Sequence, residues 1–254
     1  MIGASYLICL FLFASITNGN PSSRIVNGFN AVPGQFPYMV SLRAAGTSAH
    51  YCGGNFVTTQ HVITAAHCVS KRKPEDIFVV SGSISNFEGG ETHGVKEIRM
   101  HEKYIGKPDS WRNDIAILKL KTPFKISALR QILVLPTRNI TTENCIFSGW
   151  GRTYFPSTSL PARLQYFTLS TLKNSDCAKK WNPSAIAECH LCAAIVHNQG
   201  VCNGDSGSAL VCDGEHHGIA SWVNPCANGV YPDVYTRVSL YLDWIHKRIL
   251  DIDH

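Results

Sequence analysis

The sequence predicts an all-β protein of two antiparallel β-barrels, closed by a C-terminal α-helix. Its apolar runs are short, rich in β-branched and aromatic residues, and separated by clusters of Gly, Pro, Asn and Ser. This rhythm is typical of an antiparallel barrel or sandwich. The runs form two successive series, from Tyr38 to Leu135 and from Asn144 to Arg237, and 254 residues suffice for two such units. Two barrels are therefore the expected architecture.

The individual elements can be placed along the chain. The strands of the first series are expected at 38–42, 61–64, 77–80 and 115–118, and those of the second near 144 and at 164–169, 218–221 and 234–237. A helical period is found at the end of the chain, where Leu242, Ile245 and Ile249 share one face and Ser239 can cap the first turn. A closing helix is expected there.

The N-terminus reads as a leader. Residues 1–19 contain the apolar run 6–14, which is too short to span a bilayer and is typical of a secretory signal peptide. No later segment is apolar enough for a membrane anchor, so a secreted, soluble protein is expected. The formal charge of +5 is spread along the chain, and the basic run 71–73 is interpreted as a solvated loop, with no nucleic-acid partner.

The cysteines indicate disulfides. The chain has ten cysteines, of which Cys9 lies in the leader, and so many in an exported chain favour disulfides over free thiols. The nine cysteines that remain without Cys9 are an odd number, so one thiol is expected to be unpaired or to form an intermolecular bond. Cys189 and Cys192 form a CxxC spacing, for which a redox or zinc site is the alternative. No second such pair occurs and the compartment is oxidising, so that alternative is disfavoured.

Three short motifs carry chemistry. Ser206 lies between Asp205 and Gly207, in a segment that could be only a turn, although such glycines also let a backbone approach a substrate carbonyl. His67 follows an apolar strand and precedes a cysteine, and Asp114 stands at the start of another apolar run. Hydroxyl, imidazole and carboxylate are the groups of an activated serine nucleophile, and they occur here in the chain order His, Asp, Ser.

With these motifs in that order, the chain from Ile25 to about Leu250 resembles the chymotrypsin-like (trypsin-fold) serine proteases. The order distinguishes that family from subtilisin-like enzymes and α/β-hydrolases. Further matching motifs are Ile25-Val26-Asn27-Gly28, Cys52-Gly53-Gly54, Ser148-Gly149-Trp150-Gly151, Ser221-Trp222 and Pro232-Asp233-Val234-Tyr235-Thr236. The resemblance implies a protease domain over 25–254, with its active site in a cleft between the two barrels.

The resemblance also assigns roles. Ser206 would be the nucleophile, His67 the general base and acid, and Asp114 the orienting carboxylate, with the N–H groups of Gly204 and Ser206 as the oxyanion hole. Ser208-Ala209 stands where the family usually has Gly-Pro, and replaces none of these groups. The implied disulfides are Cys52–Cys68, Cys145–Cys212, Cys177–Cys192 and Cys202–Cys226. Cys189 is then left over, although it remains open which of Cys189 and Cys192 bonds Cys177.

The segment 20–24 would be an activation peptide. In the family, cleavage after a basic residue, here Arg24, frees an α-amino group, here that of Ile25, which pairs with the acid before the nucleophile, here Asp205. The expected partners are protein or peptide substrates, an activating trypsin-like protease and protein protease inhibitors, and the protein is expected to be a monomer. No cofactor is expected.

Three remaining features concern the surface. Asn139 belongs to the one Asn-x-Ser/Thr sequon without proline and indicates a glycan. The segment 83–87 stands where part of the family's acidic calcium loop would fall, and only Glu88 and Glu91 lie nearby, so no structural metal is expected. His216 and His217 lie between Cys212 and the next strand, where a loop is expected.

The pocket for the side chain before the scissile bond (P1) would set specificity. Gly200 takes the place of the trypsin aspartate, Val223 replaces a glycine at the mouth, and Asp233 lies at the far wall. With Val201 they resemble the pocket of elastases, which favours small aliphatic residues. The wider expected pocket also includes Asn203, Ser221 and Trp222. Trp181, and Gly200 with Asp233, instead resemble chymotrypsin-like and collagenolytic enzymes, which is the alternative. A non-catalytic homologue that binds partners, or a ligand carrier, is the alternative from another class.

Overall fold

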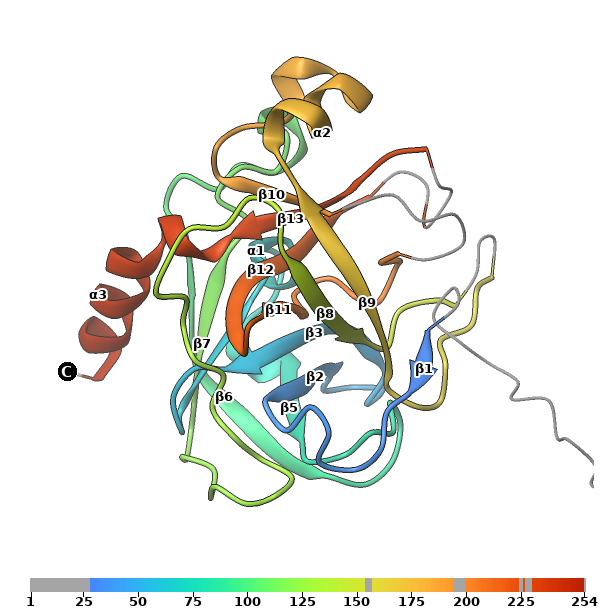
Figure 1. The fold of residues 1–254 in the computed structure, drawn as a ribbon. Helices are drawn as coiled ribbons and strands as arrows, with labels where there is room; N and C mark the ends of the chain where they lie inside the picture. Colours follow the sequence, from blue (N-terminus) through green and yellow to red (C-terminus); the bar gives the residue numbers. More distant parts are fainter. Residues whose placement is uncertain (1–27, 154–156, 194–199, 224–225, 227–229, 254) are drawn as a thin grey trace, which may run out of the picture.

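Two six-stranded antiparallel barrels form the body of the computed structural model (Figure 1). It describes residues 28–153, 157–193, 200–223, 226 and 230–253. The expected signal and activation segments, with Arg24 and Ile25, lie outside the described residues. The predicted fold class is confirmed, because each apolar run expected to be a strand lies in one of the two barrels.

The first barrel closes in the order β2-β3-β4-β7-β6-β5. Its strands are β2 (Met39–Ala44), β3 (His50–Phe56), β4 (His61–Thr64), β5 (Ile77–Ser81), β6 (Glu91–Met100) and β7 (Ala116–Leu120). Every residue of β4 and β7 is buried, because one face of these strands fills the barrel and the other is covered from outside. Ile117 and Leu118 share a core cluster with Ile245 of the C-terminal helix.

The second barrel is closed by the pairing of β8 with β9. The strand order is β9-β10-β13-β12-β11-β8, and β1 (Phe29–Asn30) adds to the outer edge of β9. Its strands are β8 (Asn144–Gly149), β9 (Gln165–Leu172), β10 (His190–Ala193), β11 (Ala209–Cys212), β12 (Glu215–Trp222) and β13 (Asp233–Arg237). Phe147, Phe167 and Tyr235 pack together inside it.

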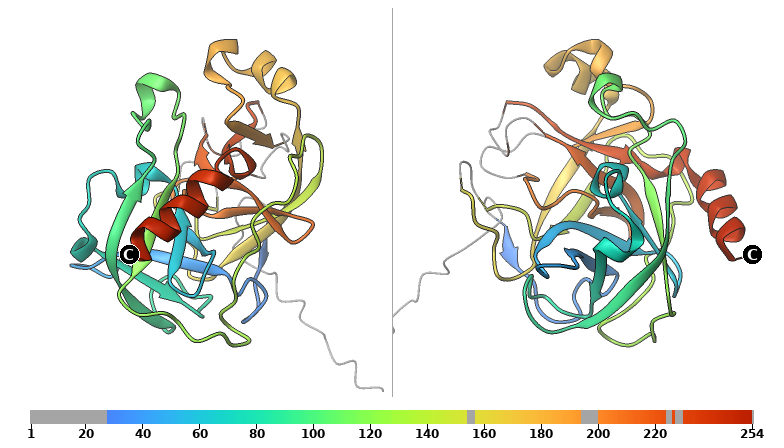
Figure 2. Two further views of the ribbon diagram at one scale, coloured as in Figure 1. Left: turned by 90° about the vertical axis from the view of Figure 1, so that its left-hand side faces the viewer. Right: turned by 180° about the vertical axis from the view of Figure 1, so that it is seen from behind.

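The helices are short, and the two longest lie on the outside of the barrels (Figures 1 and 2). The α-helices are α1 (Ala66–Val69), α2 (Asn174–Lys180) and α3 (Leu242–Asp253), and the 3₁₀ turns are η1 (Pro74–Asp76), η2 (Lys107–Asp109), η3 (Pro183–Ala185) and η4 (Val238–Leu240). The predicted C-terminal helix is confirmed. Ser239, however, lies inside η4 and its hydroxyl donates to Asn139 Oδ1, so its expected capping role is wrong.

The prediction of a loop at His216 and His217 is also wrong. Both residues belong to β12 and are buried, since β11 and β12 are joined by the tight turn at Asp213 and Gly214. Both of these turn residues have positive φ, as in a two-residue hairpin turn. The strands therefore continue up to the turn, and no longer loop is present between them. Burial lowers the pKa of His216 to about 3, so this imidazole is neutral at physiological pH and acts as core.

Four disulfides join the cysteines that the family resemblance implied. They are Cys52–Cys68, Cys145–Cys212, Cys177–Cys192 and Cys202–Cys226. Cys189 is the free thiol, so the open choice at Cys177 is settled in favour of Cys192.

The two barrels meet at a glycine contact that positions the serine loop. Gly53 N donates to Ser206 O at 2.8 Å, and a Cβ on Gly53 would lie 2.1 Å from Ser208 Oγ. Gly207 has a φ of +85°, and a Cβ there would lie 2.4 Å from Gly53 O. Only glycines allow this approach, because any side chain would overlap the opposite barrel. The Cys-Gly-Gly motif therefore docks the first barrel against the loop that carries Ser206.

Candidate active site

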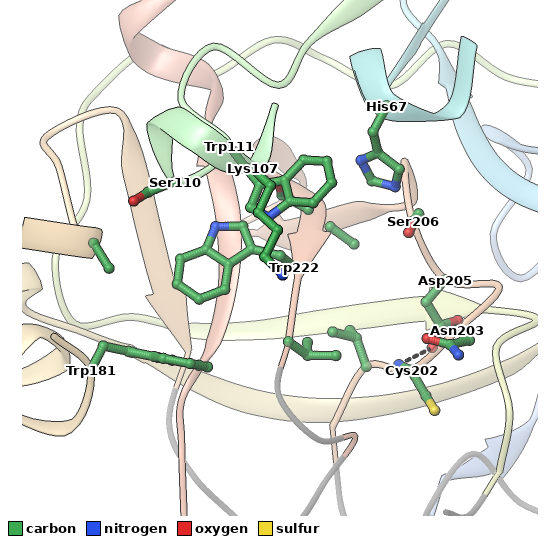
Figure 3. Close-up of a pocket in the computed structure, with 15 residues that line it drawn as sticks. His67, Lys107, Ser110, Trp111, Trp181, Cys202, Asn203, Asp205, Ser206 and Trp222 are labelled. Carbon is green, nitrogen blue, oxygen red and sulfur yellow. Dashed lines mark hydrogen bonds between the residues drawn. The ribbon is translucent and has the colours of Figure 1, made fainter. Parts of the chain in front are cut away.

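A cavity of about 600 Å³ lies where the barrels meet (Figure 3). The first barrel and its connections contribute His67, Lys107, Ser110 and Trp111. The second contributes Trp181, Ala185, Val201, Cys202, Asn203, Asp205, Ser206 and the segment from Ala220 to Val223. The structure thus brings His67 and Ser206 together from segments that are far apart in the sequence.

His67 and Asp114 are joined by two hydrogen bonds. His67 follows β4 on the short helix α1, next to the Cys52–Cys68 disulfide, and Asp114 lies just before β7. His67 Nδ1 is 2.7 Å from Asp114 Oδ2, and the backbone N–H of His67 donates to Asp114 Oδ1 at 2.9 Å. Because β4 and β7 are neighbouring strands, the pairing of the first barrel brings these two residues to the same edge. The carboxylate is fully buried.

The imidazole is poised to accept a proton on its other nitrogen. Burial alone would lower the pKa of His67, but the charge of Asp114 and its hydrogen bond raise it above the ordinary value. With Nδ1 facing the carboxylate, Nε2 is left for the cavity, and Figure 3 shows the ring directed toward Ser206. Trp111 stacks edge-on against the ring at 5.6 Å between centroids, and covers it on one side.

Ser206 lies in a loop shaped by two glycines with positive φ. Gly204 has a φ of +103° and Gly207 a φ of +85°. His50 Nε2 lies 2.9 Å from Gly204 O, and His50 Nδ1 lies 2.8 Å from Ser41 Oγ, so the carbonyl of Gly204 is held away from the cavity. Within the described part of the chain, the N–H groups of Gly204 and Ser206 donate to no acceptor. Both donors are therefore free for a ligand.

Asp205 is buried beneath this loop without a cation. Its Oδ1 accepts from Gly151 N at 2.7 Å and its Oδ2 from Cys202 N at 2.9 Å. The glycines of the Ser-Gly-Trp-Gly motif make room for it, since a Cβ at Gly149 or Gly151 would come within about 2 Å of the carboxylate. Burial raises the pKa of Asp205 to about 7, although the two N–H donors oppose the shift. No lysine, arginine or histidine of the described residues pairs with it.

Some of the residues predicted for the P1 pocket line the cavity, and two of them lie behind it. Val201, Asn203, Ser221, Trp222 and Val223 line the cavity, as expected. Gly200 and Asp233 do not line it, and lie together behind Val201 instead. A Cβ on Gly200 would be 2.7 Å from Asp233 Oδ2, and that oxygen accepts from Val201 N at 2.8 Å.

Asp233 is consequently a buried acid behind the pocket. Burial raises its pKa to about 7, opposed by the bond from Val201 and reinforced by the charge of Asp205.

Several site residues were not identified from the sequence. Ser221 was expected only as pocket wall, but its hydroxyl donates to Asp114 Oδ2 at 2.6 Å, and Thr236 Oγ1 donates to Asp114 O at 2.8 Å. Lys107 and Trp111 lie in a turn whose sequence shows only loop character. A glycine and three non-glycine residues with positive φ shape this turn, namely Gly106, Ser110, Trp111 and Asn113. The sequence pattern does not predict which side chains of such a turn face the cavity.

The residues present do not favour a metal site. Among the described residues, the one group of His, Cys and acidic side chains close enough to share an ion is Cys52, His67 and Cys68, whose two sulfurs are bonded to each other. In the loop where the family has its calcium site, Glu91 pairs with Arg130 and lies 3.8 Å from His93. The carboxylate of Glu91 is thus already neutralised by Arg130.

The fold and cleft define a protein of the chymotrypsin-like class, as the motifs indicated. A family model described as Trypsin matches residues 25–245. The chain is 37% identical to the fibrinolytic enzyme, isozyme C, of Lumbricus rubellus over 238 residues, which cover 87% of this chain and 98% of that protein. It is 33% identical to a trypsin of Xenopus laevis over 247 residues, covering 96% and 98%. It is 34% identical to the anionic trypsin of Bos taurus over 249 residues, covering 96% and 97%.

The chain belongs to the trypsin family of serine proteases and is accordingly a serine endopeptidase. Proteases of this kind act on protein substrates and are inhibited by protein inhibitors. In the part of the chain that the structure describes, no helix has the length and apolar character needed to cross a membrane.

Proposed function

We propose that the protein cleaves peptide bonds with Ser206 as nucleophile, His67 as general base and acid, and Asp114 as the carboxylate that orients His67. The observation that carries the proposal is the 2.7 Å bond between His67 Nδ1 and Asp114 Oδ2, with Ser206 on the same cavity. This bond keeps the Nδ1 proton in place and turns Nε2 toward the serine.

The chemistry proceeds in two halves. Ser206 Oγ attacks the carbonyl carbon while His67 Nε2 takes the hydroxyl proton, and the N–H groups of Gly204 and Ser206 donate to the oxyanion. The C–N bond then breaks, His67 returns its proton to the leaving amine, and an acyl-enzyme remains. A water molecule, deprotonated by His67, attacks the ester, and Ser206 leaves with the proton.

The protein is secreted and made as a zymogen. Residues 1–19 form the signal, 20–24 the activation peptide and 25–254 the protease domain. A fully buried carboxylate such as Asp205 is strongly disfavoured in its charged form without a cation, and the α-amino group of Ile25 would supply one after cleavage at Arg24. A trypsin-like protease would make that cut.

The preferred P1 residue is small and aliphatic. Val201 and Val223 line the cavity, where their branched side chains would leave less room than glycine, and Asp233 accepts from Val201 N instead of lining the cavity. The named relatives include trypsins, and Asp233 is the residue here that could attract a basic P1 side chain. The chymotrypsin-like or collagenolytic alternative draws support from Trp181, which packs on Trp222 beside the cavity.

Fluorophosphonate labelling tests the catalytic assignment. The activated protein should be labelled at Ser206, and Ser206→Ala should fold, keep its disulfides and lose both labelling and amidase activity. Equal turnover by the alanine variant would reject Ser206 as nucleophile. An unlabelled wild-type protein that still binds peptides would favour the non-catalytic homologue.

Anilide substrates test the pocket. We expect Val, Ala, Ile or Leu to be cleaved faster than Phe or Arg. Val223→Gly should shift the preference toward Phe and Tyr by about 10- to 200-fold, since the methyl groups of Val223 cause overpacking of roughly 1–3 kcal/mol against an aromatic ring. Wild-type enzyme that prefers Phe or Arg would reject the elastase-like pocket.

Two surface features complete the proposal. Asn139 is exposed, and its Oδ1 accepts from Arg237 Nη1 and Ser239 Oγ, which leaves the amide nitrogen for a glycan. The protein acts as a monomer without a cofactor.

A further inference from the structure

The active-site cavity continues beyond the P1 pocket along a wall of indole rings. Trp181 and Trp222 pack edge to face with centroids 4.6 Å apart, and Trp111 stands beside His67. Figure 3 shows these rings on one side of the cavity and Ser206 on the other. Trp222 directly precedes Val223 of the P1 pocket. A substrate whose P1 side chain occupies the proposed pocket at Val223 would place the residues that precede P1 over these rings.

One exposed, positively charged side chain, that of Lys107, lies beside these indole rings. Lys107 lines the cavity from the first residue of η2, directly after Gly106, and its side chain is exposed. Its ammonium group has no ion-pair partner among the described residues. The other ionisable side chains of the lining are His67, which is bonded to Asp114, and Asp205, which is fully buried.

The acid nearest to Lys107 in the chain is already neutralised. Asp109 Oδ1 accepts from Arg112 Nη1 at 2.7 Å, and Arg112 Nη2 donates to Ser184 O at 3.2 Å. These bonds fasten the 106–112 turn to the η3 segment of the other barrel, and Figure 2 shows both standing at the same end of the molecule. The turn is thus held in place over the cavity, and Lys107 is its uncompensated charge.

We propose that Lys107 makes the protease prefer substrates with Asp or Glu two to four residues before the scissile bond. The proposal rests on the assignment of Ser206 and of the pocket at Val201 and Val223. An extended peptide advances about 3.3 Å per residue and alternates its side chains, so one side chain can reach the ammonium while its neighbour packs on the indoles. An acidic residue next to an apolar one is the pattern that this wall fits.

The size of the preference follows from the setting. A partly exposed ion pair is worth up to about a fivefold change in an equilibrium constant, and salt weakens it because the Debye length falls from roughly 14 Å at 0.05 M to about 4 Å at 0.5 M. The preference is therefore modest and sensitive to ionic strength. A preference that came from apolar packing would not decline with salt.

The test uses peptide anilides with Val at P1 and either Glu, Gln or Lys at P2, P3 or P4, in otherwise identical sequences. Wild-type enzyme should cleave the Glu substrate about 3- to 5-fold faster than the Gln substrate at one of these positions, measured as kcat/KM at 0.05 M salt. The ratio should approach one at 0.5 M salt. Lys107→Met, which keeps the length of the side chain, should abolish the ratio, and Lys107→Glu should invert it in favour of Lys.

Lys125→Glu is the matched control. Lys125 is exposed and lies outside the cavity lining, so this variant has the same change in net charge and should retain the wild-type ratio. Equal cleavage of Glu and Gln substrates by wild-type enzyme at all three positions, or an unchanged ratio in Lys107→Met, overturns the proposal. If another P1 residue proves better than Val, the series is built on that residue, so failure of the P1 assignment and failure of the Lys107 proposal are observed separately.

Discussion

The carboxylate of Asp233 accepts a 2.8 Å hydrogen bond from the backbone N–H of Val201. The acid therefore lies behind Val201, which lines the cavity, and Asp233 itself does not line it. This relationship explains how a chain related to trypsins can hold an acid near the pocket without presenting it openly to a substrate.

The same relationship predicts a pH-dependent selectivity. Because burial raises the pKa of Asp233 to about 7, the carboxyl group is neutral below that pH and charged above it. The ratio of kcat/KM for an Arg substrate to that for a Val substrate should rise between about pH 6 and 8. His67 affects both substrates equally, so its titration cancels in the ratio. Asp233→Asn should remove the rise, and a ratio that is flat in wild-type enzyme would mean that the charge does not reach the substrate.

Ser221 should act as a positioning residue for Asp114. Ser221→Ala removes a 2.6 Å hydrogen bond to the buried carboxylate. Such charge-assisted bonds contribute about 1.5–3 kcal/mol to stability. The value of kcat should fall by the part of this energy that is lost in the transition state, at most roughly 150-fold. The carboxylate left with one donor fewer should raise the pKa of His67 further, so the acid limb of the pH–rate profile should move to higher pH. Thr236→Val is the control, because it removes a bond to the backbone oxygen of Asp114 and leaves the carboxylate unchanged. An equal shift in both variants would contradict the prediction.

Activation should change how stability depends on pH. In the uncleaved chain the pKa of Asp205 is raised to about 7 from an ordinary 3.8, so the folded state binds the proton more tightly than the unfolded state. Stability should then decline as pH rises from about 4 through 7, by on the order of 3 kcal/mol. In the cleaved protein, pairing with the Ile25 amine should lower this pKa and remove the decline. Thermal unfolding across this pH range should be compared for two inactive proteins. One is the cleaved Ser206→Ala protein, and the other is the uncleaved double variant Ser206→Ala, Arg24→Gln. Parallel curves would contradict the pairing.

Cys189 should remain a reduced and slowly reacting thiol. It is partly buried against the first barrel's core, and burial raises its pKa above the ordinary value, which lowers its thiolate fraction at neutral pH. A maleimide should label the native protein slowly and label one equivalent rapidly after unfolding without reductant. Cys189→Ser should keep all four disulfides and show no fast phase. A disulfide-linked dimer on a non-reducing gel would contradict the prediction and the expected monomer together.

The sequence by itself determined the local chemistry and the architecture. Short alternating runs can bury a face only in sheets, so two series of them indicated two barrels before any contact was known. The motifs around His67, Asp114 and Ser206 indicated their roles through a family resemblance. Gly53 and Gly207 stood in family-like motifs, and the structure supplies the reason for them, because a Cβ at either position would overlap the opposite barrel.

Only the tertiary structure decided which groups act together across the two barrels. Ser221 meets Asp114 across 107 residues, and Arg112 fastens the Lys107 turn to Ser184 across 72 residues. His216 lies in a core strand, although its place between Cys212 and the next expected strand predicted a loop. Local patterns report what a few neighbouring residues prefer. Contacts between distant segments depend on strand register and barrel closure, which are set by the packing of the whole chain.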